Sequence, residues 1–230
     1  NFPLHDDITE RFSKIVDHWR LIDKLSHDSV AALVEDDEID ILIDLSGYTA
    51  GHRLPVFARK PAPIQATWIG YFNTTGLPAM DYIITDIDLL PPSDEHLFLE
   101  KPLRLPFSGA CFTLPDFDIP IRRPPALGSN TFTFGCFSNK KKYTEEVLSL
   151  WGEILNKVPN SNLFLKAFGL GSPDTCELYR ERFRSMGIDP TRLIFEDLTT
   201  LDHYLSRYND VDLMLDTFPY NAGTTCLQAL

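Results

Sequence analysis

The sequence has few cysteines, few basic residues and no long apolar run, and each shortage excludes a class of protein. Its 230 residues include four cysteines, and no two of them form a CxxC pair. With no signal peptide at the start, a reducing cytoplasm fits this use of cysteine best. No stretch of eighteen apolar residues occurs, which excludes a transmembrane helix. We therefore expect a soluble globular protein of the cytoplasm with no membrane partner.

Basic residues are too few for a surface that binds nucleic acid. The chain has 21 lysines and arginines against 33 aspartates and glutamates, which gives a net charge of −12. Such a surface repels a phosphate backbone, so we expect no nucleic-acid partner. Acidic residues gather early, between residues 6 and 40, where a solvated face is the ordinary explanation. A basic site elsewhere on the chain is compatible with this balance.

Several catalytic and binding motifs are missing as well. The sequence contains no GxxxxGK[ST] loop, and no GxGxxG follows the first strand expected in either half. Nucleotide hydrolysis by a P-loop and NAD binding therefore lose support. No GxSxG turn that would carry a nucleophilic serine occurs. The six histidines show no ligand spacing, so we expect no metal site.

What is present is an alternation of helix and strand patterns. Apolar residues recur at helical spacing from 8 to 34 with a break at Ser26, which predicts two helices. A further short helix is expected at 54–60. Strands are expected at 39–45, 64–71 and 81–85. This alternation favours a parallel sheet with helices on its faces.

Proline divides the chain into two parts. Eight prolines fall between Leu89 and Gly128, a density that blocks helix interiors and central strands. A strand at 97–105 would therefore lie at a sheet edge. We expect a first Rossmann-like half at 1–115, a linker at 116–130 and a second half at 131–230.

The second half repeats the pattern more regularly. Helices are expected at 144–157, 174–186 and 201–208. Strands are expected at 131–137, 162–168, 192–195 and 213–215. Four strand–helix units in about a hundred residues indicate a Rossmann-like half.

The last eighteen residues, 213–230, combine a strand, a turn and the start of a helix. In a parallel sheet such a loop faces the ligand crevice, and the helix after it directs unpaired N–H groups at a ligand. Small residues at Ala222 and Gly223 and hydroxyls at Thr224 and Thr225 suit a phosphate. The alternative, that Thr224 simply caps the helix, has equal support from these residues.

A lysine cluster forms a second candidate. Loop 138–142 contains three consecutive lysines and follows the strand expected at 131–137. Because loops after parallel strands share one edge of the sheet, we expect this loop to face the same crevice as Thr224 and Thr225. Solvation of a helix start is the alternative, although lysine at that position opposes the helix dipole.

Longer motifs carry a resemblance to one family. They are Pro61–Gln65 (PAPIQ), Trp68–Tyr71 (WIGY), Thr75–Gly76, Asp81–Asp86 (DYIITD), Leu215–Thr217 (LDT) and Thr224–Thr225. In this order and spacing, from about residue 40 to residue 230, the chain resembles the catalytic region of the O-linked N-acetylglucosamine transferases and the related SPINDLY proteins. The resemblance implies an inverting glycosyltransferase of α/β class and GT-B fold, with both Rossmann-like halves incomplete in this fragment. It also implies tetratricopeptide repeats upstream in the full-length protein.

The resemblance assigns roles to particular residues. Lys142 matches a catalytic lysine that contacts the diphosphate and stabilises the departing nucleotide. The backbone at Leu198 and Thr199 matches a loop that reads the base. Gly70 and Tyr71 match a loop of the first half near the donor sugar. The residues expected to bind the nucleotide sugar are Asn139, Leu198, Thr199, Arg207, Gly223, Thr224, Thr225, Gln228, Gly70 and Tyr71.

The chain departs from the family pattern at three points. Gly223 replaces a histidine of the animal enzymes, and Gln228 stands where an acidic residue usually binds the ribose. A histidine motif resembling HPxSH, which lies near the acceptor hydroxyl in the family, is expected before Asn1. We therefore expect this fragment alone to be inactive.

The resemblance implies transfer of N-acetylglucosamine from UDP-N-acetylglucosamine to serine and threonine hydroxyls of an acceptor protein, with no cofactor and no metal. One alternative is transfer of fucose from GDP-fucose, because Thr74–Pro78 looks closer to the SPINDLY proteins. Another is a module that binds a nucleotide or a protein partner without turnover. The oligomeric state is left open.

Overall fold

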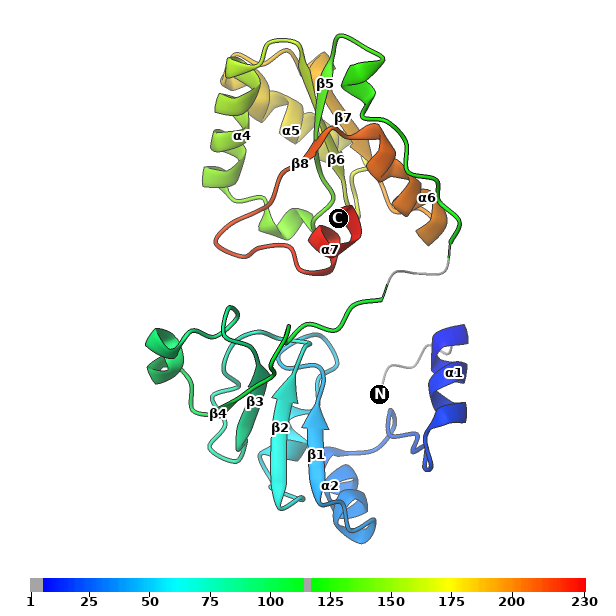
Figure 1. Ribbon diagram of the computed structural model, residues 1–230, viewed down its shortest axis with the longest axis vertical. Coiled ribbons are helices and arrows are strands. Elements are labelled where there is room, and N and C mark those ends of the chain that lie inside the picture. Colours follow the sequence, from blue (N-terminus) through cyan, green and yellow to red (C-terminus); the bar gives the residue numbers. More distant parts are fainter. Residues whose placement is uncertain (1–5, 114–116) are drawn as a thin grey trace. The chain divides into compact units, whose positions relative to one another are not determined.

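Two parallel sheets of four strands each organise the described residues, 6–113 and 117–230, of this computed structural model (Figure 1). The chain divides into two units, residues 1–111 and 112–230. Each unit contains one sheet with its own helices. The expected α/β class with two Rossmann-like halves is confirmed by these sheets. The boundary expected between residues 115 and 116 lies outside the described residues.

The first unit has short helices before and between its strands. Its helices are α1 (Asp7–Ile15), α2 (His27–Asp36) and α3 (Leu54–Phe57), with a 3-10 turn η1 (Pro92–Leu97). Its strands are β1 (Ile41–Asp44), β2 (Ile64–Trp68), β3 (Tyr82–Thr85) and β4 (Lys101–Arg104). They lie in the order β1-β2-β3-β4, all parallel. As expected, β4 is an edge strand, and the N–H group that Pro102 lacks would point away from β3, so the sheet loses no hydrogen bond there.

The first helix is shorter than its apolar spacing predicts. α1 ends at Ile15 and the backbone is extended at Val16, although the apolar spacing continues to Leu25. The segment that follows α1 is instead held by the Arg53 guanidinium, from a distant part of the chain. The guanidinium donates to Ile22 at 2.5 Å and to Leu25 at 2.9 Å. Tertiary contacts override the local helical pattern here.

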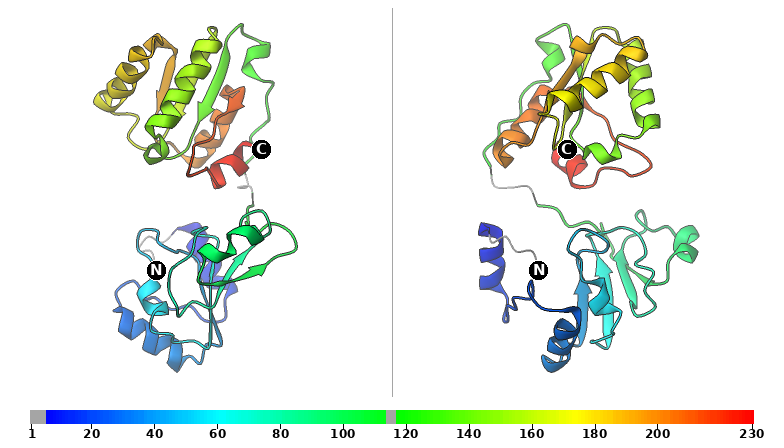
Figure 2. Two further views of the ribbon diagram at one scale, coloured as in Figure 1. Left: turned by 90° about the vertical axis from the view of Figure 1, so that its left-hand side faces the viewer. Right: turned by 180° about the vertical axis from the view of Figure 1, so that it is seen from behind.

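The second unit alternates strand and helix more regularly (Figure 2). Its strands are β5 (Phe132–Cys136), β6 (Ser161–Lys166), β7 (Leu193–Glu196) and β8 (Leu213–Met214). Its helices are α4 (Glu145–Lys157), α5 (Pro173–Ser185), α6 (Leu201–Ser206) and α7 (Thr224–Ala229). Its 3-10 turns are η2 (Pro125–Leu127), η3 (Lys140–Lys142), η4 (Pro190–Arg192) and η5 (Arg207–Asp210). The strand order is β7-β6-β5-β8, all parallel, so β5 and β6 lie inside the sheet.

Alternation along β6 builds a layer on each face of the second sheet. Leu163 and Leu165 are fully buried in the core that α4 and α5 close, where Trp151 of α4 is 1% exposed. Phe164 faces the other layer, formed by α6 and η5. Because successive strand residues face opposite sides, Lys166 shares the face of Phe164. This placement brings a lysine into the interior of the unit.

Part of the proline-rich stretch is held on the second unit. The backbone N–H of Arg122 donates to the side chain of Asn209 at 2.8 Å. The backbone N–H of Ala126 donates to the Asp212 carboxylate at 2.9 Å. Asp212 also accepts from the backbone N–H of Thr133 in β5 at 2.8 Å, so one carboxylate joins this stretch to the sheet.

Candidate functional site

The loops that follow β5 and β8 emerge side by side. These strands are neighbours in the sheet, with Phe134 paired to Leu213 and Gly135 to Met214. Because the strands are parallel, both loops leave from the same carboxyl edge. The lysine turn η3 and the start of α7 are thereby brought to one place (Figure 1).

Lys142 lies against the loop after β8. Its Nζ donates to the carbonyl oxygen of Asn221 at 2.8 Å and lies 4.4 Å from the ring centroid of Tyr220. Burial raises the pKa of the Cys226 thiol in α7, and the nearby Lys142 ammonium opposes that effect. A positive charge therefore stands beside the loop that leads into α7, where an anionic ligand would meet both the ammonium and the N–H groups at the start of the helix.

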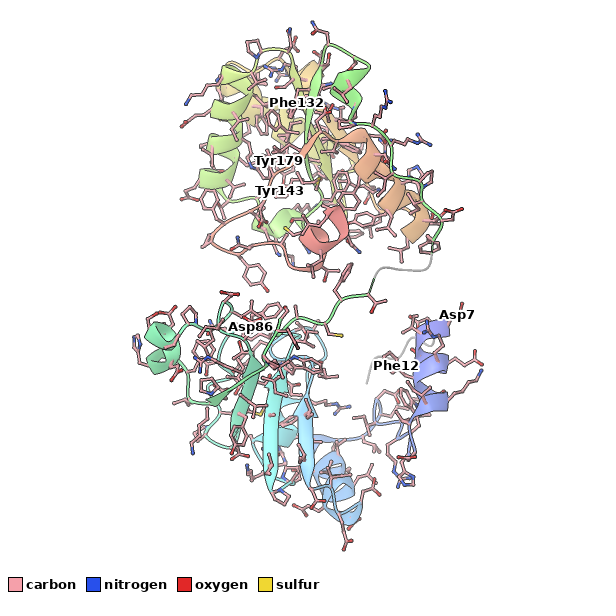
Figure 3. The ribbon with its side chains drawn as sticks, viewed as in Figure 1. Asp7, Phe12, Asp86, Phe132, Tyr143 and Tyr179 are labelled. Carbon is pink, nitrogen blue, oxygen red and sulfur yellow. The ribbon has the colours of Figure 1, made fainter. Side chains whose placement is uncertain are left out.

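Buried contacts hold the lysine loop in place. The Tyr143 hydroxyl donates to the carbonyl oxygen of Ser138 at 2.9 Å, and its ring packs 5.3 Å from that of Trp151. Figure 3 shows Tyr143 in the interior of the second unit. The Asn139 side chain accepts from the backbone N–H of Lys141 at 3.0 Å and so opens η3. Asn139 shapes the loop in this structure, and its contact with a nucleotide stays a prediction.

Asp216 closes the loop after β8 on itself. Its carboxylate accepts from the backbone N–H groups of Thr217 (2.7 Å) and Ala222 (2.8 Å) and from the side-chain amide of Asn221 (3.2 Å). Partial burial raises the pKa of Asp216, but these donors outweigh it and hold the pKa below its ordinary value. Because both ends of the turn bind one carboxylate, the loop presents its groups to Lys142 in a defined position.

α7 begins at Thr224, and Gly223 is its N-cap. The Gly223 carbonyl accepts from the N–H groups of Cys226 (3.0 Å) and Leu227 (3.3 Å), and no side chain within residues 6–113 and 117–230 caps the helix. The alternative that Thr224 caps the helix is therefore wrong, since Thr224 is the first helical residue. Among the described residues, the exposed Thr224 hydroxyl has no hydrogen-bond partner. The first turn thus offers N–H groups and a hydroxyl to a ligand.

Two tyrosines tie α7 to α6 and η5. The Tyr204 hydroxyl donates to Oε1 of Gln228 at 3.1 Å, and the Tyr208 hydroxyl donates to the carbonyl oxygen of Thr225 at 3.2 Å. The two hydroxyls lie 2.7 Å apart. The oxygen of Gln228 is therefore engaged within the protein, which leaves the amide N–H groups for a ligand. The ribose contact expected of Gln228 stays a prediction.

Lys166 holds the loop after β7 from inside the sheet. This lysine is 1% exposed, and its Nζ donates to the Thr199 hydroxyl (2.9 Å) and to the Asp197 carbonyl oxygen (2.7 Å). The Asp197 carboxylate in turn accepts from the backbone N–H of Leu198 at 2.7 Å. The Leu198 side chain is 65% exposed. Leu198 and Thr199 are thus held in place and exposed at the carboxyl edge of the sheet.

Arg207 is also engaged within the protein. Its Nε donates to Oε2 of Glu196 at 2.7 Å, and its Nη1 pairs with Asp210. The guanidinium packs 4.7 Å from the ring centroid of Phe164. The other Glu196 oxygen accepts from Lys166 at 2.7 Å, so the carboxylate bridges two cations. A direct contact of Arg207 with a ligand stays a prediction.

Gly70 and Tyr71 lie on the first unit, in the loop after β2. The preceding Ile69 has a positive φ of 55°, which is rare for a β-branched residue, and the N–H of Gly70 donates to the Trp68 carbonyl at 2.7 Å. A Cβ on Gly70 would lie 2.1 Å from the carbonyl oxygen of Leu45, so this loop requires glycine. Such local strain is typical of functional loops.

The sequence analysis missed three residues that shape this site. Lys166 lies in the apolar strand NLFLKAF, and a charged residue in a strand of that kind is buried when it is paired. Asp216 directly follows the apolar end of β8, where an aspartate side chain accepts N–H groups of a turn. Glu196 carries no comparable signal, because Lys166 is distant from it in the sequence.

Neither a metal cluster nor a membrane span is found within residues 6–113 and 117–230. No group of three or more His, Cys, Asp or Glu side chains there could hold a metal ion. No helix in the same ranges is both long enough and apolar enough to cross a bilayer.

Relatives of this chain are named as protein glycosyltransferases. It is 41% identical over 217 residues to the SPINDLY protein of Petunia hybrida, named a probable UDP-N-acetylglucosamine–peptide N-acetylglucosaminyltransferase. It is 33% identical over 228 residues to the SEC protein of Arabidopsis thaliana, which carries the same enzyme name. These alignments cover 92% and 94% of this chain, which spans 23% of the length of each relative.

A solved structure and a family profile agree with these relatives. The structure of a mutant O-GlcNAc transferase from Thermobaculum terrenum superposes with a TM-score of 0.92 at 37% identity, over 99% of this chain and 43% of that chain. Residues 5–122 and 115–230 match the profile of glycosyl transferase family 41. The chain therefore belongs to glycosyl transferase family 41.

Proposed function

We propose that the protein containing this chain transfers N-acetylglucosamine from UDP-N-acetylglucosamine to serine and threonine hydroxyls of acceptor proteins. The observation that carries the proposal is the contact of the Lys142 ammonium with the carbonyl oxygen of Asn221, in the loop that leads into α7. An ammonium, free N–H groups and a threonine hydroxyl at one sheet edge match the chemistry of a diphosphate. The enzyme names of the relatives favour N-acetylglucosamine over fucose as the sugar.

The reaction in this proposal is a single displacement at the anomeric carbon. The acceptor oxygen forms a bond to that carbon and transfers its proton to a base or to water, while the bond from the carbon to the phosphate oxygen breaks. The electron pair leaves with UDP, so negative charge increases on the diphosphate in the transition state. Lys142 and the start of α7 stabilise this charge more strongly in the transition state than in the bound donor.

The remaining candidates divide along the length of the donor. Thr224 and Thr225 hold the diphosphate, the backbone at Leu198 and Thr199 contacts the base, and Gln228 faces the ribose. The positive charge comes from protein groups in this mechanism, so transfer needs no added metal. We place the protein in the cytoplasm, in agreement with its four free cysteines, two of them buried.

Sugar transfer by the full-length protein tests this proposal. Labelled UDP-N-acetylglucosamine and labelled GDP-fucose are offered separately with serine- and threonine-containing peptides, with and without EDTA. We expect transfer of N-acetylglucosamine, unchanged by EDTA. Transfer of fucose alone would overturn the choice of donor. Transfer of neither sugar, with intact binding of UDP, would overturn the proposed enzymatic activity and favour a module that only binds its ligand.

A further inference from the structure

Lys166 is a fully buried lysine whose donors all have partners. It is 1% exposed at the carboxyl end of β6. Its Nζ donates to Oε1 of Glu196 (2.7 Å), to the carbonyl oxygen of Asp197 (2.7 Å) and to the hydroxyl of Thr199 (2.9 Å). An ammonium has three donors, so this set uses all of them. Burying a charge is costly unless it is paired in this way.

These bonds fix the loop after β7 from one side. Two of the three reach the loop itself, at Asp197 and Thr199, and the third reaches the last residue of β7. Lys166 comes from a different strand, so it joins the loop to the interior of the sheet. The ammonium also lies 5.9 Å from the ring centroid of Tyr204, whose hydroxyl donates to Gln228 of α7.

A second set of bonds fixes the same loop from the other side. The Asp197 carboxylate accepts from the backbone N–H groups of Gly169 (2.8 Å) and Gly171 (3.1 Å), in the loop after β6. A Cβ on Gly171 would lie 2.7 Å from that carboxylate, so glycine allows this approach. Between the two anchors Leu198 and Thr199 stay exposed. The structure thus holds a short, solvent-exposed segment in one conformation.

We propose that Lys166 is a positioning residue for the base of the nucleotide. By bonding to Asp197 and Thr199, it holds the backbone at Leu198 and Thr199 in the conformation that binds the base. The proposal deepens the proposed function and rests on it for the identity of the ligand. The advantage is entropic, because a loop that is already ordered loses little freedom when the base binds.

If Lys166 positions the base, its loss should weaken binding of the base and leave binding of the diphosphate unchanged. Lys166→Met has nearly the same length and removes all three bonds. We expect the Kd for UDP to rise about tenfold, the size expected when charge-assisted hydrogen bonds to a binding loop are lost. The inhibition constant for pyrophosphate, which has no base, should stay the same. Lys142→Met should instead weaken both UDP and pyrophosphate.

Kinetics of the full-length protein separate positioning from loss of fold. In Lys166→Met we expect KM for the donor to rise about tenfold and kcat to change less than about twofold, because the diphosphate contacts remain. A merely destabilised variant would lose kcat at an unchanged KM. Lys157→Met, at the exposed C-terminal end of α4, is the matched control and should leave both constants unchanged.

Thr199→Val keeps the inference testable if Lys166→Met fails to fold. This change removes one acceptor and leaves the Lys166–Glu196 ion pair, and we expect the Kd for UDP to rise about threefold. When Thr199→Val is combined with Lys166→Met, the Kd for UDP should rise little further than in Lys166→Met alone, since both changes remove the same bond. Unchanged UDP binding in Thr199→Val, or equal weakening of UDP and pyrophosphate in Lys166→Met, would overturn the inference. Should the wild type bind UDP as described but transfer no sugar, the proposed function fails and the inference about binding stands.

Discussion

Replacing Asp216 with alanine should disorder the loop that docks against Lys142. The two backbone N–H groups of Thr217 and Ala222 would lose a charged acceptor, and Asn221 would lose its partner. Such bonds contribute about 1.5–3 kcal/mol each when buried, but Asp216 is exposed and water replaces much of that. We therefore estimate a loss of about 2 kcal/mol of loop stability, which corresponds to about a 30-fold change in population.

This loss should reach the chemistry through Lys142. We expect kcat/KM in Asp216→Ala to fall about 10- to 30-fold in the full-length protein, with an unchanged far-UV circular dichroism spectrum. Asp216→Asn is the matched control, since its amide oxygen still accepts from Thr217 and Ala222, and we expect a fall of less than about fivefold. Wild-type kcat/KM in Asp216→Ala would refute the reasoning that this loop places Lys142.

Further predictions concern the ring beneath Lys142, the bridge at Glu196 and the core. Tyr220→Leu should lower kcat about two- to fivefold through loss of an exposed cation–π contact, whereas Tyr220→Phe should retain it; equal rates in both variants would refute this. Burial raises the pKa of Glu196, but Lys166 and Arg207 outweigh it and hold the pKa below the ordinary 4.5. Glu196 therefore stabilises the fold above pH 4.5, and this contribution is lost as the pH falls further. The free energy of unfolding in urea should accordingly depend less on pH below 4.5 in Glu196→Gln than in the wild type. An equal pH dependence in both proteins would contradict the lowered pKa of Glu196. Trp151→Ala should destabilise the second unit by about 3–5 kcal/mol in the same assay, and a loss below about 1 kcal/mol would contradict its place in the core.

Much of the fold is predictable because local patterns and long-range packing agree. The strand at 131–137 and the helix at 144–157 appear as β5 and α4, since their apolar residues face one shared core. The edge position of β4 was predictable from the density of prolines around it, among them Pro102 within the strand. The helical spacing up to Leu25 was misleading, because the residues before α2 are held by tertiary contacts with Arg53, far along the chain, and do not continue the helix.

The candidate site was predictable where it depends on topology. Parallel strands bring the lysine turn and the start of α7 to one edge, and this could be expected before any contact was known. The buried hydrogen bonds that hold these loops in place could not be predicted in the same way. Lys166 bonds to residues thirty or more positions away, and its burial depends on Glu196 being on the neighbouring strand. Pairing of this kind is set by register, which the residue pattern alone does not specify.

Turnover of the Lys142→Met variant tests the central claim most directly. In the full-length protein, kcat for transfer from UDP-N-acetylglucosamine is measured beside the wild type and the Lys141→Met control, with thermal unfolding to confirm an intact fold. We predict a fall of about 10²- to 10³-fold in Lys142→Met, the loss typical of removing one group that stabilises charge in the transition state. The control should keep its rate. An unchanged kcat in a folded Lys142→Met variant would contradict the account.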